Sequence, residues 1–364
     1  MLELKVDLGE RSYPIYIGEG ILKDIVSYFA QHKIRTTSPL LIISDDQVAP
    51  LYLEQVTGLL LEGGFRVVQS IVPSGEKSKS LSVFEEIITT ALEGGLDRNS
   101  TVIALGGGVV GDLAGFVAAS FMRGIRFVQI PTTIQAHDSS VGGKVAVNHS
   151  LAKNIIGAFH QPEMVIYDIS TLHTLPMREV KSGLAELVKQ GLLWDADFVN
   201  WCDAHSDKLL ALDSEALQYA LYQGCRIKAI VVSQDERESG LRAILNLGHT
   251  IGHALEAVSQ YSELLHGEAI SIGMVGAARL AIKLGHSEHI YSETKRLLLK
   301  FGLPTRLPAH LDIDEIMSAM MHDKKFKEGG MVFIIPTAIG TVEINKTVSV
   351  EWVREIIEQL KKEK

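Results

Sequence analysis

Three histidines lie within one apolar, glycine-rich stretch in the second half of the chain: His249, His253 and His266. His249 and His253 are four residues apart, so on a helix they share a face and their ring nitrogens can converge on one point. The pair is superficially similar to the His-Glu-x-x-His helix of metalloproteases, but Thr250 stands where that helix has its general base. A catalytic zinc usually takes three protein ligands. The sequence therefore predicts a metal site and leaves its third ligand open.

A carboxylate and an ammonium group stand three residues apart in an apolar segment, at Glu186 and Lys189. The simplest interpretation is an intrahelical salt bridge, which stabilises a helix by only a few tenths of a kcal/mol. However, the neighbours Leu184, Leu187 and Val188 are apolar, so the helix is predicted to be largely buried. A buried glutamate needs a cation, and a metal would serve.

A glycine loop occupies residues 106–112, between a predicted strand and a predicted helix. Its backbone amides and the helix N-terminus could hold a pyrophosphate. No acidic residue ends a strand about twenty residues later, where the ribose ligand of a dinucleotide is expected. Asp45, at the end of an earlier predicted strand, could take that role. Alternatively, the glycines only allow close packing of helix and strand.

Basic and hydroxyl side chains gather in the segment from Asp138 to Lys144 and at Lys153 and Asn154, with Arg123 just upstream. Such a segment suits an anionic, polyhydroxylated ligand. The loops 73–79 and 131–133 also follow predicted strands, where the ligands of open α/β sheets bind. The charged run 235–238 is typical of solvated surface.

The bulk composition excludes several classes of protein. The net charge of −9, with no basic tract, argues against nucleic acid. No apolar run approaches the roughly 18 residues of a membrane-spanning helix, and residues 1–5 do not have the order of a signal peptide. The cysteines, Cys202 and Cys225, are too few for a disulfide framework. The protein is expected to be cytoplasmic and to bind neither nucleic acid nor membrane.

Two kinds of periodicity predict the elements that position these residues. Short apolar strands alternate with amphipathic helices in the first half, which predicts a parallel sheet covered by helices. The expected strands are 40–44, 65–68, 100–105, 127–130 and 164–167, and the expected helices are 51–62, 81–94 and 109–121. Helical periodicity dominates later, at 184–193, 216–233, 250–258, 268–284, 292–301 and 351–361, with a hairpin at 331–335 and 341–344.

The chain of 364 residues exceeds the size at which single cores stop growing. We therefore expect an α/β fold with two domains. Residues 1–175 should form a Rossmann-like parallel-sheet domain, and residues 176–364 a mainly α-helical domain.

Taken together, these motifs resemble the 3-dehydroquinate synthase family of sugar-phosphate cyclases over nearly the whole chain. The motifs, in order, are Gly75-Glu76 with Lys79, GGGVVGD, Pro-Thr-Thr, DSSVGGK, KNIIGAFHQP, GLAELVK, LNLGHTIGHALE, LHGEAISIGM and Asp-Lys-Lys. The resemblance implies an active site between an NAD-binding domain and a metal-binding domain, and a homodimer.

The resemblance also implies roles for individual residues. The zinc ligands would be Glu186, His249 and His266, so that His253 becomes a substrate-side residue. Catalytic roles fall on His253, Lys144, Lys189, Arg123, Asn154 and Asp138, and substrate contacts on Lys228, Arg242, Asn246 and Lys325. NAD-binding positions are Asp45, Ser74, Gly75, Glu76, Lys77, Lys79, Gly107, Gly108, Val109, Val110, Gly111, Asp112, Thr132, Thr133, Lys144, Lys153 and Thr171.

The implied reaction converts 3-deoxy-D-arabino-heptulosonate 7-phosphate, a phosphorylated sugar acid, to 3-dehydroquinate and phosphate. It proceeds by oxidation at C5, phosphate elimination, re-reduction, ring opening and aldol closure, with NAD regenerated in each turnover. The metal is expected to be zinc, although cobalt would also suit the ligands.

Three alternatives remain open from the sequence. They are a sister cyclase acting on sedoheptulose 7-phosphate or glucose 6-phosphate, a metal-dependent polyol dehydrogenase that releases NADH, and a non-catalytic protein that keeps the fold. Arg242 and the intact SVGGK stretch favour the heptulosonate, because its carboxylate needs a cationic partner.

Overall fold

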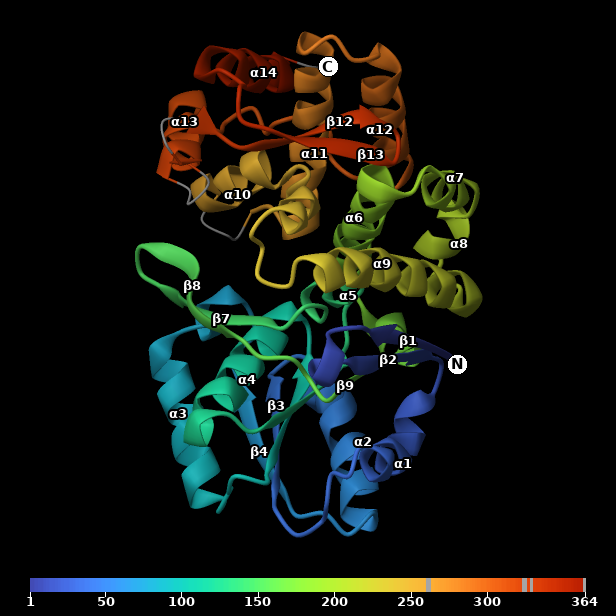
Figure 1. The fold of residues 1–364 in the computed structure, drawn as a ribbon, viewed down its shortest axis with the longest axis vertical. Helices are drawn as coiled ribbons and strands as arrows, with labels where there is room; N and C mark the ends of the chain where they lie inside the picture. The colour runs from blue at the N-terminus through green and yellow to red at the C-terminus, as the bar shows by residue number, and fades with distance from the viewer. Residues whose placement is uncertain (260–262, 323–325, 328–329, 363–364) are drawn as a thin grey trace. The chain divides into compact units, whose positions relative to one another are not determined.

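The computed structural model describes residues 1–259, 263–322, 326–327 and 330–362. They form two compact units (Figure 1). The α/β unit comprises Met1–Leu175 with Leu217–Arg237, and the helical unit comprises Pro176–Ala216 with Glu238–Lys364.

The α/β unit is built on a seven-stranded sheet with the order β1-β2-β9-β6-β5-β3-β4. The strands are β1 (Leu2–Val6), β2 (Tyr13–Gly18), β3 (Leu40–Asp45), β4 (Val67–Val72), β5 (Thr101–Gly106), β6 (Arg126–Pro131) and β9 (Met164–Asp168). Only the edge pair β1 and β2 is antiparallel. All six residues of β5 are buried, as expected for a strand covered on both faces. The predicted parallel sheet is confirmed.

Helices cover both faces of this sheet because its strands are apolar on both sides. Leu40 and Ile42 of β3 pack with α1 (Ile25–Gln31) and α2 (Ala49–Glu62). Leu41 and Ile43 point to the opposite face and pack with α3 (Leu81–Glu93) and α4 (Gly108–Ser120). Figure 1 shows these two helical layers on either side of the strands. The alternation of the strand side chains therefore places α4, and the glycine loop that precedes it, against the middle of the sheet.

The structure adds strands that the sequence did not predict. The segment predicted as part of a ligand loop forms a hairpin of β7 (Lys144–His149) and β8 (Ala152–Phe159). β7 packs against α4 at Gly115, where a Cβ would lie 2.3 Å from Val145. The strand predicted at 65–68 begins two residues later, at Val67 of β4. Phe65 is apolar because it is a buried core residue just before the strand.

The helical unit contains α6 (Met177–Trp194), α7 (Ala196–Ala204), α8 (Ser206–Leu210), α10 (His249–Val258), α11 (His266–Lys283), α12 (Glu288–Lys300), α13 (Ile313–His322) and α14 (Val350–Lys362). The strands β12 (Phe333–Ala338) and β13 (Thr341–Asn345) form the predicted hairpin, and β10 (Phe326–Lys327) pairs with β11 (Gly330–Met331). No helix among the described residues has the length and apolar content needed to cross a membrane.

Helix α9 (Ser214–Gln234) is shared between the units, and Leu217–Gln234 belongs to the α/β unit. The prediction of a fully solvated surface at 235–238 was wrong. Asp235 is 9% exposed, and the carboxylate of Glu236 accepts two hydrogen bonds of 2.7 Å from Arg11. A charged run looks solvated in the sequence, but here an ion pair with Arg11 compensates the partial burial of Glu236, while Arg237 is exposed.

Candidate active site

Three side chains of the helical unit converge on one point. Glu186 lies in the middle of α6, His249 is the first residue of α10, and His266 is the first residue of α11. Glu186 Oε1 lies 3.5 Å from His249 Nε2 and 3.1 Å from His266 Nε2. One donor atom from each residue lies within 4.8 Å of the other two. Donors bound to a tetrahedral zinc at about 2.0 Å lie roughly 3.3 Å apart, so the cluster fits such an ion.

The outer ring nitrogens of both histidines are held by hydrogen bonds. Nδ1 of His249 donates to the backbone oxygen of Leu247 at 3.1 Å, because a carbonyl oxygen can only accept. Nδ1 of His266 lies 3.1 Å from a carboxylate oxygen of Glu256. Both rings therefore direct Nε2 toward Glu186, which is the arrangement in which outer partners fix the tautomer of metal-binding histidines.

Glycines allow the three helices to approach closely enough for this convergence. A Cβ on Gly267 would lie 2.0 Å from the backbone oxygen of Ser182, so α6 and the start of α11 touch through their backbones. A Cβ on Gly273 would lie 1.9 Å from the backbone oxygen of Gly248, just before α10. Gly248 itself has a φ of +78°, a conformation that favours glycine.

The cluster is largely buried, although the His266 side chain is 20% exposed, and it is rich in negative charge. The second oxygen of Glu186 lies 2.6 Å from Lys189 Nζ, and both side chains are 1% exposed. Burial opposes the charge of His266, but the carboxylates of Glu256 and Glu186 together outweigh it and raise its pKa to about 10. The carboxylates around His266 thus stabilise positive charge at this position. The His253 ring lies 5.2 Å from the His249 ring, at the edge of the cluster.

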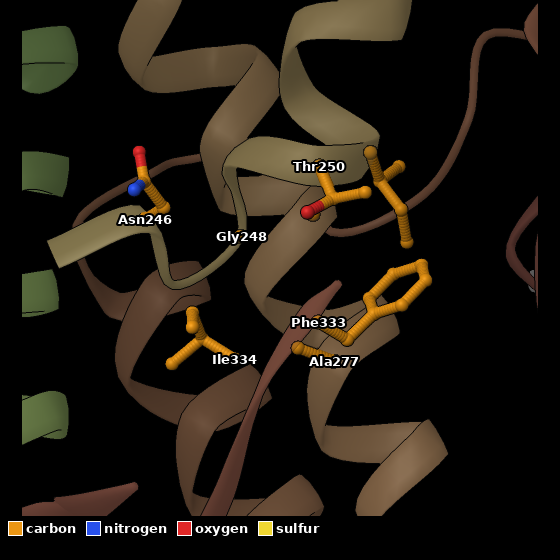
Figure 2. A pocket seen from close by; sticks show the side chains of 8 residues that line it. Asn246, Gly248, Thr250, Ala277, Phe333 and Ile334 are labelled. Atoms are coloured by element: carbon orange, nitrogen blue, oxygen red, sulfur yellow. The ribbon is translucent and has the colours of Figure 1, made fainter. Parts of the chain in front are cut away.

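Arg242 and Asn246, predicted to contact substrate, belong to the 3-10 helix Leu241–Asn246 that precedes α10. Arg242 is 2% exposed, and Asn246 Nδ2 donates to Glu238 at 2.9 Å. Figure 2 shows Asn246 on one side of Gly248 and Thr250 on the other, where all three line a small, tightly packed hollow. Lys325 lies outside the described residues.

In the α/β unit, the glycine loop lies at the point where the strand order reverses. The chain leaves β3 toward β4 but leaves β5 toward β6, so the carboxyl ends of β3 and β5 border the crevice in which ligands of open α/β sheets bind. Asp45 ends β3, and Gly107 and Gly108 follow β5 at the start of α4. One oxygen of Asp45 accepts from the amides of Gln47 and Val48, which holds the loop before α2.

The loop after β6 lies directly beside these glycines. The amide of Thr132 donates to the backbone oxygen of Gly106 at 3.0 Å, and a Cβ on Gly107 would lie 3.0 Å from Thr133. The buried hydroxyl of Thr132 has no hydrogen-bond partner among the described residues. The helix N-terminus, the close glycine backbone and this hydroxyl fit a pyrophosphate and its nucleoside.

A buried ion-pair network joins the predicted nucleotide loops. Lys79 is 3% exposed, and its ammonium lies 2.6 Å from Asp112 on α4 and 3.4 Å from Glu76. It also donates to the amide oxygen of Asn154 on β8. Burial raises the pKa of Asp112, and Lys79 opposes that shift. Lys153 lies 3.6 Å from Glu76. The network therefore gathers four of the predicted NAD-binding residues and one predicted catalytic residue, Asn154.

Other predicted residues take separate places in the α/β unit. Lys228 of α9 is 7% exposed and lies 2.7 Å from the carboxylate of Asp138, in α5 (Ala136–Ser139). Thr171 is buried after β9, and its hydroxyl donates to the backbone oxygen of Asp168. The remaining nucleotide positions lie in the two loops and the first turns of α4: Ser74, Gly75, Lys77, Val109, Val110 and Gly111. Lys144 is exposed at the start of β7.

Arg123 lies apart from the predicted residues at the carboxyl ends of the strands. It follows the C-terminus of α4 and precedes the start of β6. It therefore lies at the edge of the sheet where the strands begin, whereas the glycine loop lies at their carboxyl ends. Arg123 is exposed and has a φ of +72°.

Glu256 is the residue of the cluster that the sequence analysis did not single out. It is 4% exposed, and its carboxylate contacts His266. Its spacing could have revealed it, because positions 249, 253 and 256 fall on one face of a helix.

Comparison with known proteins finds relatives that cover most of the chain. The protein family described as "3-dehydroquinate synthase N-terminal" matches residues 69–182, and the family described as "3-dehydroquinate synthase C-terminal" matches residues 183–326. A 3-dehydroquinate synthase from Desulforamulus reducens is 51% identical over 347 residues, which is 95% of this chain and 96% of that protein.

Two solved structures have the same fold. A 2-deoxy-scyllo-inosose synthase complexed with carbaglucose-6-phosphate, NAD+ and Co2+ has a TM-score of 0.90 and 28% identity, covering 98% of this chain and 99% of its own. A 2-epi-5-epi-valiolone synthase from Streptomyces hygroscopicus, with NAD+ and Zn2+ bound, has a TM-score of 0.88 and 26% identity, covering 97% and 98%. The fold is thus that of the sugar-phosphate cyclases. Within that class, the chain belongs to the 3-dehydroquinate synthase family.

Proposed function

We propose that the protein converts 3-deoxy-D-arabino-heptulosonate 7-phosphate to 3-dehydroquinate and phosphate, and is thus a phosphate-eliminating carbon–oxygen lyase. The observation that carries this proposal is the convergence of Glu186, His249 and His266 in a chain of this family. The reaction would serve the biosynthesis of aromatic amino acids through chorismate. A cytoplasmic location and a homodimer belong to the same proposal.

We propose that Glu186, His249 and His266 hold the metal, because their donor atoms have the spacing of zinc ligands. The same donors accept cobalt. When bound, the metal supplies a Lewis acid for the substrate hydroxyls and NAD supplies a hydride acceptor that is regenerated. We also propose that Lys189 orients Glu186, because its ammonium lies 2.6 Å from the second carboxylate oxygen.

Residues around the cluster are proposed to bind and to move protons. His253 lies at the edge of the three-ligand group, where it can relay a proton from a substrate hydroxyl. Arg242 and Asn246 are proposed to bind substrate oxygens from the turn before α10. Arg123, Lys325, Asp138 and Lys228 stay predictions as substrate residues, drawn from the family pattern.

The α/β unit is proposed to bind NAD, and the helical unit to bind the metal. The support is the position of Asp45 and the glycine loop at the reversal of strand order. Gly107 and Gly108 would let the pyrophosphate approach the backbone, and the Thr132 hydroxyl would gain a partner. Lys79 would hold Glu76 and Asp112 in place beside the cofactor.

The test is phosphate release from 3-deoxy-D-arabino-heptulosonate 7-phosphate by chelator-treated protein, with and without zinc and a catalytic amount of NAD. We expect release that needs both additions, with no net absorbance from NADH. NADH accumulation with a polyol would contradict the proposal and identify a dehydrogenase.

A sister cyclase is the second candidate, because the 2-deoxy-scyllo-inosose synthase has a TM-score of 0.90 with this chain. The same assay separates the two when sedoheptulose 7-phosphate and glucose 6-phosphate are supplied in place of the heptulosonate. The two sugars lack the carboxylate that Arg242 is proposed to bind. Arg242→Met should therefore reduce kcat/KM for the heptulosonate, by about 100-fold if a charged hydrogen bond is lost.

A further inference from the structure

Glu256 is a buried carboxylate to which the proposed function gives no part. It lies on α10, and its side chain is 5% exposed. A carboxylate at this burial is costly unless a cation or a hydrogen-bond donor compensates it. The His266 ring offers such a donor, because its Nδ1 lies 3.1 Å from a carboxylate oxygen of Glu256.

The backbone makes this contact specific to one nitrogen of His266. His249 and Glu256 are seven residues apart on α10, which is two helical turns, so both side chains face the start of α11. His249 approaches the cluster from one end of that face, and Glu256 approaches the His266 ring from the other. Nε2 of His266 is thereby left at 3.1 Å from Glu186, on the opposite side of the ring.

We infer that Glu256 is a positioning residue that orients His266 for metal binding. It accepts the Nδ1 proton of His266, which fixes the tautomer with Nε2 as the ligand nitrogen and increases the basicity of the ring. The inference rests on the proposed metal site. The two histidines differ in this respect, since Nδ1 of His249 donates to the neutral carbonyl of Leu247.

A competing assignment uses the same side chains. His253, Glu256 and His266 also offer donor atoms within 4.8 Å of one another. In that arrangement Glu256 would itself be a ligand, and Glu186 would not be needed. The two assignments make opposite predictions for a glutamine at position 256, because an amide oxygen can accept the Nδ1 proton but is a weak metal ligand.

The experiment measures the zinc dissociation constant of chelator-treated protein by competition with a chromogenic chelator, and the visible spectrum of the cobalt-loaded protein. The variants are Glu256→Ala, Glu256→Gln, Glu186→Gln and Asp195→Ala. Asp195 caps α7 by accepting from the amide of Phe198 at 3.0 Å, away from the cluster, so its variant shows what loss of stability alone does to metal affinity.

We expect Glu256→Ala to weaken zinc binding by about 10- to 100-fold and to alter the cobalt spectrum. Glu256→Gln should restore most of the affinity, Glu186→Gln should abolish tight binding, and Asp195→Ala should change neither readout. Unchanged affinity in a folded Glu256→Ala protein would overturn the inference, as would equal weakening in Asp195→Ala.

Tight binding in Glu186→Gln together with its loss in Glu256→Gln would also overturn the inference, in favour of Glu256 as a ligand. Failure of the unaltered protein to bind zinc would remove the proposed function itself. That outcome differs from a normal dissociation constant that is insensitive to position 256, which removes only the role of Glu256.

Discussion

Glu186 faces two kinds of partner in the helical unit, histidine rings and an ammonium group. Its Oε1 faces the Nε2 atoms of His249 and His266, and its Oε2 faces the ammonium of Lys189. A buried carboxylate needs compensation for the water it loses. The salt bridge suggested by the spacing of Glu186 and Lys189 and the predicted metal site are therefore compatible, because each uses a different oxygen.

Glu186→Gln is expected to weaken zinc binding by more than about 100-fold, since loss of an outer partner alone costs 10- to 100-fold. Turnover should fall with metal content. The measurement is zinc content by atomic absorption after dialysis, together with phosphate release. The matched control is Glu358→Gln, which alters an exposed helical Glu-Lys pair with Lys362 and should retain both. Unchanged zinc content in Glu186→Gln would contradict the ligand assignment.

Glycines determine how closely the helices that carry the proposed ligands approach one another. Gly273→Ala is expected to destabilise the protein by about 3 kcal/mol, the upper end for overpacking, because the new Cβ would meet the Gly248 backbone oxygen at 1.9 Å. Denaturant unfolding would measure the change.

Gly58→Ala is the control for that substitution. It lies within α2 with nothing within 4 Å of its Cβ, so alanine should stabilise the protein by about 0.5–1 kcal/mol. Equal effects of the two substitutions would show that α10 and α11 are not in close backbone contact.

An ion cluster joins α7 to α12. Asp203 accepts hydrogen bonds from Arg296 and Lys300, which lower its pKa from 3.8 to about 2. Because the folded pKa lies below the unfolded one, the stabilisation is complete above about pH 4 and is lost as the pH falls toward 2. After allowance for solvent screening around the half-exposed Arg296 and Lys300, we expect about 1 kcal/mol.

Asp203→Asn should therefore reduce the free energy of unfolding by about 1 kcal/mol at pH 7 and by roughly half as much at pH 3. Asp314→Asn removes an exposed pair with Arg354 and should have an effect of a few tenths of a kcal/mol. A difference between Asp203→Asn and the unaltered protein that stays constant from pH 7 to pH 3 would contradict this account.

The sequence predicted most elements because their patterns are local. Buried strands such as β5 are continuous apolar runs, and helices such as α6 repeat their apolar residues at helical spacing. The hairpin of β7 and β8 was missed because lysine, asparagine and glycine in that segment indicated a ligand loop. Its strands form through packing of Val145 on α4, which is a tertiary contact.

The residues of the candidate site could largely be predicted from the sequence, but their arrangement in space could not. The spacing of His249 and His253 suggested a shared metal, whereas the structure brings His249 together with Glu186 and His266 from two other helices. Glu256 lies ten residues before His266 in the chain, and the packing of α10 against α11 brings the two side chains together. Such contacts depend on how helices cross, which no local pattern contains.

The chain as a whole carries a net charge of −9, although its proposed substrate is an anion. A few positively charged side chains are nevertheless buried, such as Lys79 and Lys228 in the α/β unit and Lys189 in the helical unit. Each of these lysines lies within 2.7 Å of a carboxylate. Local cationic groups therefore coexist with a net negative charge, so a negative chain can still present positive charge at particular positions.

Removal of the metal should loosen one unit of the molecule and leave the other unchanged. The three proposed ligands come from α6, α10 and α11, so metal binding joins segments that are far apart in the sequence. A ligand that binds only the folded state stabilises it by about 4 kcal/mol at a free concentration 1,000 times its dissociation constant.

Hydrogen–deuterium exchange of zinc-loaded and chelator-treated protein would measure this effect segment by segment. We expect faster exchange without zinc in 183–193, 249–258 and 266–274, because the helices that carry the ligands lose their shared partner. The strands β3, β5 and β6 provide the internal control and should exchange at the same rate in both samples, since none carries a proposed ligand. Faster exchange spread evenly over both units would contradict a metal site confined to the helical unit, and no change anywhere would contradict the site itself.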